Sequence, residues 1–135
     1  MPAIQIRQQC LDEMLSDVRS APLQECCGLL AGREGTITRI FAAANAASDS
    51  ERNYEIAPQE LFRLMRDIRA AKLELLGIYH SHPNGKNEPS ARDIELAYYP
   101  DTAYLILSPL ADAPSPVRAF SIRDGRATEL KIQIF

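Results

Sequence analysis

Both histidines of this chain lie in one tripeptide, His80-Ser81-His82, at the end of an apolar segment that is predicted to be a strand. Residues two apart on a strand point to the same face of a sheet, so the two imidazoles are expected to lie side by side. After a loop rich in Pro, Gly and Asn, Ser90 begins a predicted helix, from which Asp93 can project back toward the histidines. This spacing requires a strand, a return loop and a helix to meet at one place.

Two imidazole nitrogens and one carboxylate oxygen are a ligand set typical of catalytic zinc. Such a zinc binds three protein ligands at about 2.0–2.2 Å and keeps a fourth position for water. The ion lowers the pKa of that water toward about 7, which supplies a nucleophile at neutral pH. The sequence therefore predicts one zinc ion per chain, held by His80, His82 and Asp93 at a hydrolytic site.

A hydrolytic site also needs a group that moves protons without binding the metal, and Glu25 is the candidate. It directly precedes an apolar run, 26–31, where an unpaired carboxylate would be costly unless the metal site lies nearby. Ser90 is the candidate donor to the oxyanion that forms when a carbonyl is attacked. The alternatives are structural: Glu25 as a solvated linker residue, and Ser90 with Asp93 as a helix-capping pair, which is compatible with a role in the site.

The remaining pattern predicts one α/β (or α+β) domain over residues 1–135, with a mixed β-sheet flanked by about three helices. Apolar residues at helical spacing indicate helices over 8–20 and 58–71, and the capping pattern indicates one over 90–98. The polar stretch 45–53 is predicted to be a solvated connection that could flank the site. Apolar runs bounded by turn residues indicate strands at 4–6, 26–31, 36–43, 75–82, 103–108, 117–123 and 127–135, with turns at 32–35 and 124–125.

Composition limits the class of protein. The net charge is −3 with a pI near 5.4, and Lys and Arg do not cluster, so nucleic-acid binding is disfavoured. No apolar run approaches the roughly 20 residues that cross a bilayer, and the N-terminus lacks the apolar stretch of an export signal, so we expect no membrane partner. Cys10, Cys26 and Cys27 are sparse and odd in number, and neighbouring strand residues face opposite ways, so no disulfide is expected. We therefore expect a reducing, cytoplasmic location.

The motif at the histidines resembles that of the JAMM (JAB1/MPN/Mov34) metalloenzyme family at every fixed position. That motif is a His-x-His pair, seven residues, a serine, two residues and an aspartate, and here it falls on His80, His82, Ser90 and Asp93. The segment 22–32 is similar to the family's glutamate-bearing segment, and the order of predicted elements agrees over essentially the whole chain. The resemblance implies the MPN-domain fold, which is similar to that of the cytidine deaminases.

The resemblance also implies roles for particular residues. By position, His80, His82 and Asp93 would bind zinc, Glu25 would be the general acid/base, and Ser90 would steady the oxyanion. Active members are zinc-dependent peptidases, many of which cut peptide or isopeptide bonds after ubiquitin or ubiquitin-like C-termini. This chain keeps all five residues and resembles the short, stand-alone prokaryotic members, which are associated with ubiquitin-like sulfur carriers. The expected partner is therefore the C-terminal tail of such a carrier, or a peptide.

Two other functions are kept as alternatives. The chain could be a zinc-bearing MPN interaction module that binds a ubiquitin-like partner without cleaving it. It could also be a cysteine hydrolase that uses Cys26 or Cys27 with a histidine, although that reading leaves Ser90 and Asp93 unexplained. A homodimer is a further possibility, because an exposed strand at either end of the chain could pair with a second copy.

Overall fold

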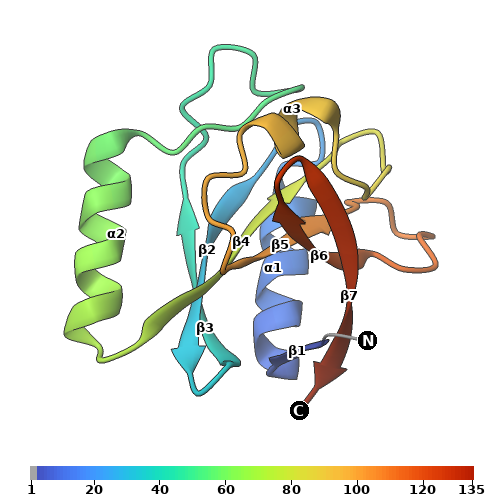
Figure 1. The fold of residues 1–135 in the computed structure, drawn as a ribbon. Coiled ribbons are helices and arrows are strands. Elements are labelled where there is room, and N and C mark those ends of the chain that lie inside the picture. The colour runs from blue at the N-terminus through green and yellow to red at the C-terminus, as the bar shows by residue number, and fades with distance from the viewer. Residues whose placement is uncertain (1–2) are drawn as a thin grey trace.

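The computed structural model describes residues 3–135, in which seven strands and three helices follow one another (Figure 1). The mixed sheet and the three helices predicted from the sequence are both found in this part of the chain. In chain order the elements are β1 (Ala3–Ile6), α1 (Gln8–Ser20), β2 (Cys27–Arg33), β3 (Thr36–Ala43), α2 (Pro58–Ala70), β4 (Glu74–Ser81), α3 (Ala91–Glu95), β5 (Ala103–Leu107), β6 (Val117–Arg123) and β7 (Arg126–Ile134).

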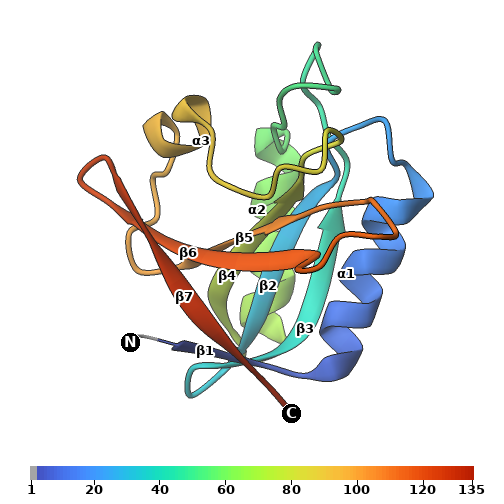
Figure 2. The ribbon, with the colours of Figure 1, turned by 90° about the vertical axis from the view of Figure 1, so that its right-hand side faces the viewer.

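The strands form one sheet in the order β1-β3-β2-β4-β5-β6-β7, and β1 also pairs with β7, so the sheet closes into a barrel. β4 and β5 run parallel, as β1 does with both of its neighbours, and the other pairs are antiparallel. Closure places the first described strand beside the last one (Figure 2). In the register, His80 on β4 lies between Cys27 on β2 and Ile106 on β5, so the site is built on a central strand.

Alternating side chains divide the buried residues between the two faces of the sheet. Leu30 and Tyr79 belong to the apolar cluster around α1, whereas Leu29 and Ile78 belong to the cluster that packs against α2. Figure 1 shows α1 and α2 on opposite sides of β2 and β3. His80 follows Tyr79 and therefore faces the same side as α2, which is where α3 brings Asp93.

The two longer helices begin and end where the sequence predicts. α1 covers residues 8–20, and apolar residues three or four positions apart form its buried face. α2 begins with Pro58 in its first turn, where the missing amide hydrogen is not needed, and ends at Ala70. The buried residues of these helices are Cys10, Leu11, Met14, Val18, Leu64 and Ile68.

Two predicted boundaries are wrong. The strand predicted over 26–31 begins at Cys27 and continues to Arg33, because a bulge shifts the register between Ala31 and Gly32 and lets pairing resume. The turn predicted over 32–35 is correspondingly shorter and is made by Glu34 and Gly35, with φ angles of 52° and 77°. The other strand ranges agree with the prediction to within one residue at each end.

The helix predicted over 90–98 is also too long, since α3 ends at Glu95. Beyond it, the backbone amide of Tyr99 donates to the hydroxyl of Tyr104 at 3.1 Å instead of to a helical carbonyl. Tyr104 belongs to β5, so a contact with the strand that follows takes the place of a helical hydrogen bond here. The result is a short helix followed by an irregular segment that reaches β5.

Cys10, Cys26 and Cys27 are free thiols, as predicted, and Cys10 and Cys27 are buried. Among the described residues, no helix combines the length and the apolar character needed to cross a membrane.

Candidate metal centre

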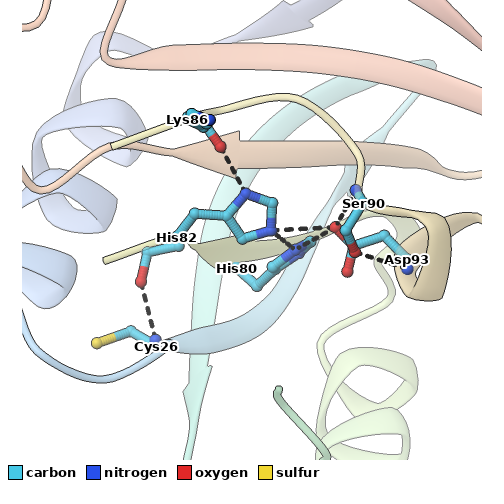
Figure 3. Close-up of polar contacts among 7 residues, drawn as sticks. Cys26, His80, His82, Lys86, Ser90 and Asp93 are labelled. Carbon is cyan, nitrogen blue, oxygen red and sulfur yellow. Dashed lines mark hydrogen bonds and ion pairs between the residues drawn. The ribbon is translucent and has the colours of Figure 1, made fainter. Parts of the chain in front are cut away.

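Three side chains converge at the end of β4, and they are the three that the sequence predicts as ligands (Figure 3). Nε2 of His80 lies 3.1 Å from Nε2 of His82. Oδ2 of Asp93 lies 3.2 Å from the first of these nitrogens and 3.0 Å from the second. β4 supplies His80, the residue after its last one supplies His82, and α3 supplies Asp93.

These distances fit a single small cation. The ligand atoms of a tetrahedral ion with bonds of about 2.0–2.1 Å lie about 3.3–3.4 Å apart, close to the 3.0–3.2 Å found here. Glu25 is also near, since ligand-type atoms of Glu25, His80 and His82 all lie within 4.8 Å of one another. For Asp93, both distances to the histidines are as short as tetrahedral coordination requires, so the geometry favours Asp93 as the carboxylate that could hold the ion.

The contacts behind the two imidazoles orient them. Nδ1 of His82 lies 2.6 Å from the carbonyl oxygen of Lys86, which can only accept, so Nδ1 carries a proton and the neutral form of the ring has its lone pair on Nε2. Nδ1 of His80 is buried and has no hydrogen-bond partner in residues 3–135. Instead, its ring stacks on Tyr54, with centroids 4.4 Å apart and planes inclined by 21°. A hydrogen bond thus fixes one ring, and aromatic packing fixes the other.

The electrostatics of His80 and Asp93 match the protonation states that a cation needs, whereas the contacts of His82 favour its protonated form, which a bound cation would have to displace. Burial lowers the pKa of His80, which keeps this imidazole neutral at neutral pH. Burial opposes the charge on Asp93, but hydrogen bonds with His80 and His82 outweigh it and hold the pKa of that carboxyl well below its usual range. Burial also disfavours charge on His82, whereas its hydrogen bonds to Asp93 and to the carbonyl of Lys86 raise its pKa.

Ser90 is the N-cap of α3, so the structural role weighed in the sequence is present. Its Oγ accepts from the amide of Asp93 at 3.0 Å, and Oδ2 of Asp93 accepts from the amide of Ser90 at 2.9 Å. The cap uses Oγ as an acceptor and leaves the hydroxyl hydrogen available. Ser90 is exposed and lines a cleft together with Glu25 and His82. The cap therefore orients Asp93 and presents the hydroxyl at the site.

Glu25 is buried, with 5% of its surface exposed, so the solvated-linker alternative is wrong. Burial is the main reason that the pKa of its carboxyl rises to about 7. The charge of His82 lowers this pKa, and those of Asp93 and Asp49 raise it. A carboxyl group with a pKa near neutrality can both take up and release a proton at neutral pH.

Two clefts flank the site. Glu25, His82 and Ser90 line a cleft of about 710 Å³, and Asp93 lines a second of about 410 Å³. The stretch 45–53, predicted as a solvated connection, contributes to both. Other residues of the larger cleft are Leu23, Glu51, Arg52, Pro83, Asn84, Lys86, Glu88 and Pro89. The smaller cleft is lined mostly by apolar and tyrosine side chains, which are Leu29, Tyr54, Ile56, Leu61, Leu75, Ile78, Leu96, Tyr98, Tyr99 and Tyr104.

The thiols next to Glu25 do not form a nucleophilic site. Burial raises the pKa of Cys27 to about 12, and it also raises that of Cys26. The Sγ atom of Cys26 lies 3.7 Å from the carbonyl oxygen of Asp17, on the side of α1. Both thiols hold their protons at neutral pH, which argues against the cysteine-hydrolase alternative.

Three contacts of the site carry no local sequence signal. Tyr54 and the carbonyl of Lys86 contact the two histidines, and Ser81 contacts Cys26, the neighbour of Glu25. None of the three has a spacing that distinguishes it from an ordinary loop or strand residue. Ser81 points to the opposite face from His80, and its Oγ accepts from the amide of Cys26 at 2.9 Å. Such contacts between distant segments become visible only in the folded chain.

Comparison with known proteins agrees with this geometry. A family model described as prokaryotic homologs of the JAB domain matches residues 7–123. A desampylase from Haloferax volcanii is 38% identical over 104 residues, which cover 73% of this chain and 75% of the relative. A CysO-cysteine peptidase from Mycobacterium tuberculosis is 30% identical over 131 residues, covering 96% and 89%. A probable TtuB-protein conjugate cleaving protease from Thermus thermophilus is 33% identical over 115 residues, covering 85% and 72%.

Solved structures share the fold. A protein from Desulfitobacterium hafniense superposes with a TM-score of 0.86 at 33% identity, covering 98% of this chain and 92% of that one. A JAB1/MPN domain protein from Archaeoglobus fulgidus superposes with a TM-score of 0.64 at 18% identity and covers 96% of both chains. The predicted MPN-type fold is confirmed. The chain belongs to the prokaryotic JAB-domain family and is a hydrolytic metalloenzyme of the JAMM type.

Proposed function

We propose that this chain is a zinc-dependent peptidase or isopeptidase that cleaves the bond after the C-terminal tail of a ubiquitin-like sulfur-carrier protein. The observation that carries the proposal is the set of two buried imidazoles and one carboxylate, with Glu25 and Ser90 beside it at one open cleft. The names of the relatives support the substrate class, since they describe cleavage of a CysO-cysteine bond and of a TtuB-protein conjugate.

His80, His82 and Asp93 would hold one zinc ion through Nε2, Nε2 and a carboxylate oxygen. When bound, zinc supplies a Lewis acid that lowers the pKa of a water molecule and stabilises negative charge on a carbonyl oxygen. The hydrogen bond between His82 and Lys86 and the stacking of His80 on Tyr54 keep both rings aimed at the same point. The neutral imidazole of His80 and the ionised Asp93 are ready to bind without releasing protons.

Glu25 would be the general acid/base. Its carboxylate form accepts the proton of the attacking water, and its carboxylic acid form then gives a proton to the leaving nitrogen. A pKa raised by burial to about 7 makes both forms available at neutral pH. A group of this kind contributes about 10²- to 10⁴-fold to a rate.

Ser90 would stabilise the oxyanion. The helix cap does not use its hydroxyl hydrogen, and Ser90 lines the same cleft as Glu25 and His82. Loss of one such donor typically costs about 10²- to 10³-fold in kcat. An extended tail that runs between the two clefts would pass the metal centre, with apolar and tyrosine side chains on one side and charged side chains on the other.

The test is cleavage of a defined fusion. A small ubiquitin-like carrier that ends in Gly-Gly, extended by one amino acid or joined to a lysine side chain, is incubated with the zinc-loaded protein. Mass spectrometry should show release after the second glycine. Glu25→Gln should keep one zinc per chain and lose at least about 100-fold in kcat.

Two results would contradict the proposal. A fusion that is bound but stays intact would assign the chain to the class of interaction modules. A Glu25→Gln protein that cleaves as fast as wild type would remove the proton-transfer role from this residue.

A further inference from the structure

The segment that connects β3 to α2 lies at the same end of the sheet as α3 (Figure 1), and it contacts two members of the site. The amide of Glu25 donates to the carbonyl oxygen of Ser50 at 2.7 Å. Tyr54 from the same segment stacks on His80. The position of this segment therefore affects both a carboxyl group and an imidazole of the site.

The side chain of Asn45 organises this segment. Its Nδ2 donates to the carbonyl oxygens of Glu25 and Asn53, each at 2.8 Å. Its Oδ1 accepts from the amides of Ala47 at 2.9 Å and Glu55 at 3.1 Å. These four bonds use the full capacity of a primary amide, which has two donor hydrogens and two acceptor lone pairs. Asn45 thus joins the beginning of the segment, its end and the backbone of Glu25.

Glu25 needs such support because it lies outside the sheet. β2 begins at Cys27, so no strand ladder fixes the backbone of Glu25. Its amide bonds to Ser50 and its carbonyl to Asn45, so both of its backbone groups are held by the connecting segment. The next residue, Cys26, is tied to the histidine strand through two hydrogen bonds with Ser81. Glu25 is therefore held between the histidine strand and the segment that Asn45 organises.

We propose that Asn45 is a positioning residue for Glu25: its amide fixes the backbone of Glu25 so that the carboxyl group faces the two histidines. The inference rests on the proposed acid/base role of Glu25. Asn45 lines neither of the two clefts, so it acts through Glu25 and not on the substrate. A displacement of about 1 Å at a reacting group can cost about 10²-fold in rate, so a loosened Glu25 should lower kcat.

Asn45→Asp tests this directly, because aspartate keeps the oxygen that accepts from Ala47 and Glu55 but loses the two donor hydrogens. We expect kcat to fall about 10- to 100-fold, with KM changed less than about threefold and one zinc per chain retained. Arg33→Gln is the matched control. Arg33 also joins two segments, through bonds of 3.0 and 3.3 Å to the carbonyls of Lys72 and Ala71, but it does so at the opposite end of β2.

A double-mutant cycle separates positioning from general damage. If Asn45 acts through Glu25, then Asn45→Asp should lower kcat in the wild type but have no effect in the Glu25→Gln protein. Equal losses in both backgrounds, or wild-type kcat for Asn45→Asp, would overturn the proposal.

Amide hydrogen exchange gives a readout that does not depend on activity. In Asn45→Asp the amide of Glu25 should exchange at least about 10-fold faster, whereas that of Leu29 in β2 should be unchanged. Unchanged protection at Glu25 would refute the structural part of the inference. Faster exchange at Glu25 in a protein that cleaves no carrier fusion would instead show that the proposed function has failed while the positioning contact stands.

Discussion

Replacing Glu25 by glutamine should stabilise the metal-free protein at alkaline pH. Burial raises the pKa of this carboxyl from 4.5 to about 7. Between these values the folded state holds a proton that the unfolded state releases, so stability falls as pH rises through this window. The full shift corresponds to about 3 kcal/mol above pH 7, at about 1.4 kcal/mol per pKa unit. Glutamine carries no charge and removes this cost.

Urea denaturation of both proteins in EDTA, at pH 5 and at pH 8, measures the effect. The free energy of unfolding of Glu25→Gln should exceed that of wild type by about 1 kcal/mol at pH 5 and by about 3 kcal/mol at pH 8. The histidines and Asp93 are present in both proteins, so the difference reports Glu25 together with its coupling to His82. Glu74→Gln, at an exposed position on β4, reports the effect of the same substitution outside the site.

The reasoning would be refuted by a stability difference that is the same at both pH values, because Glu25 would then not be held in a desolvated position. Zinc should also act differently on the two proteins. A cation beside Glu25 favours its carboxylate, so zinc should raise the unfolding free energy of wild type more than that of Glu25→Gln at pH 8. Burial of this carboxyl would then be a cost to folding that serves the site.

Three further substitutions test the packing and the site. Gly28→Ala should lower the free energy of unfolding by about 1–3 kcal/mol in urea denaturation. The reason is that a Cβ at this position would lie 2.5 Å from Cε1 of Tyr79 and 2.7 Å from the carbonyl oxygen of Phe41. An unchanged free energy would mean that β2 and β4 can separate at little cost. Tyr79→Phe should lose about 1.5–3 kcal/mol in the same assay. The hydroxyl of Tyr79 donates to Oδ2 of Asp17 at 2.8 Å and so joins α1 to β4. A loss under about 0.5 kcal/mol would show that this hydrogen bond contributes little to stability. Ser90→Ala should lower the free energy of unfolding by about 0.5–2 kcal/mol, because the helix cap is lost. It should also lower kcat by about 10²- to 10³-fold while zinc is retained. A stability loss with unchanged kcat would mean that Ser90 is a helix cap alone.

The features predicted from the sequence are those with a local cause. The apolar spacing of residues 8–20 defines α1, and Pro58 marks the start of α2, because both depend on neighbours within a few positions. The candidate metal ligands could be predicted for the same reason. His80 and His82 share a face through strand periodicity, and the capping pattern at Ser90 places Asp93 in the first turn of α3.

The remaining features depend on contacts between segments that are distant in sequence. Closure of the barrel, for example, requires β1 to pair with β7. Asn45 is the clearest case. In the sequence it begins a polar stretch, 45–53, and a solvated connection is the ordinary reading of such a stretch. Its four hydrogen bonds reach residues up to 20 positions away, and no periodicity could indicate them.

The central claim is that one zinc ion is held by His80, His82 and Asp93, with Glu25 beside it. Anomalous diffraction at the zinc edge from crystals of the zinc-loaded protein tests this most directly. The account predicts one peak per chain, about 2.0–2.2 Å from Nε2 of both histidines and from a carboxylate oxygen of Asp93. A peak bonded to Glu25 in place of Asp93, or no peak at the end of β4, would contradict it.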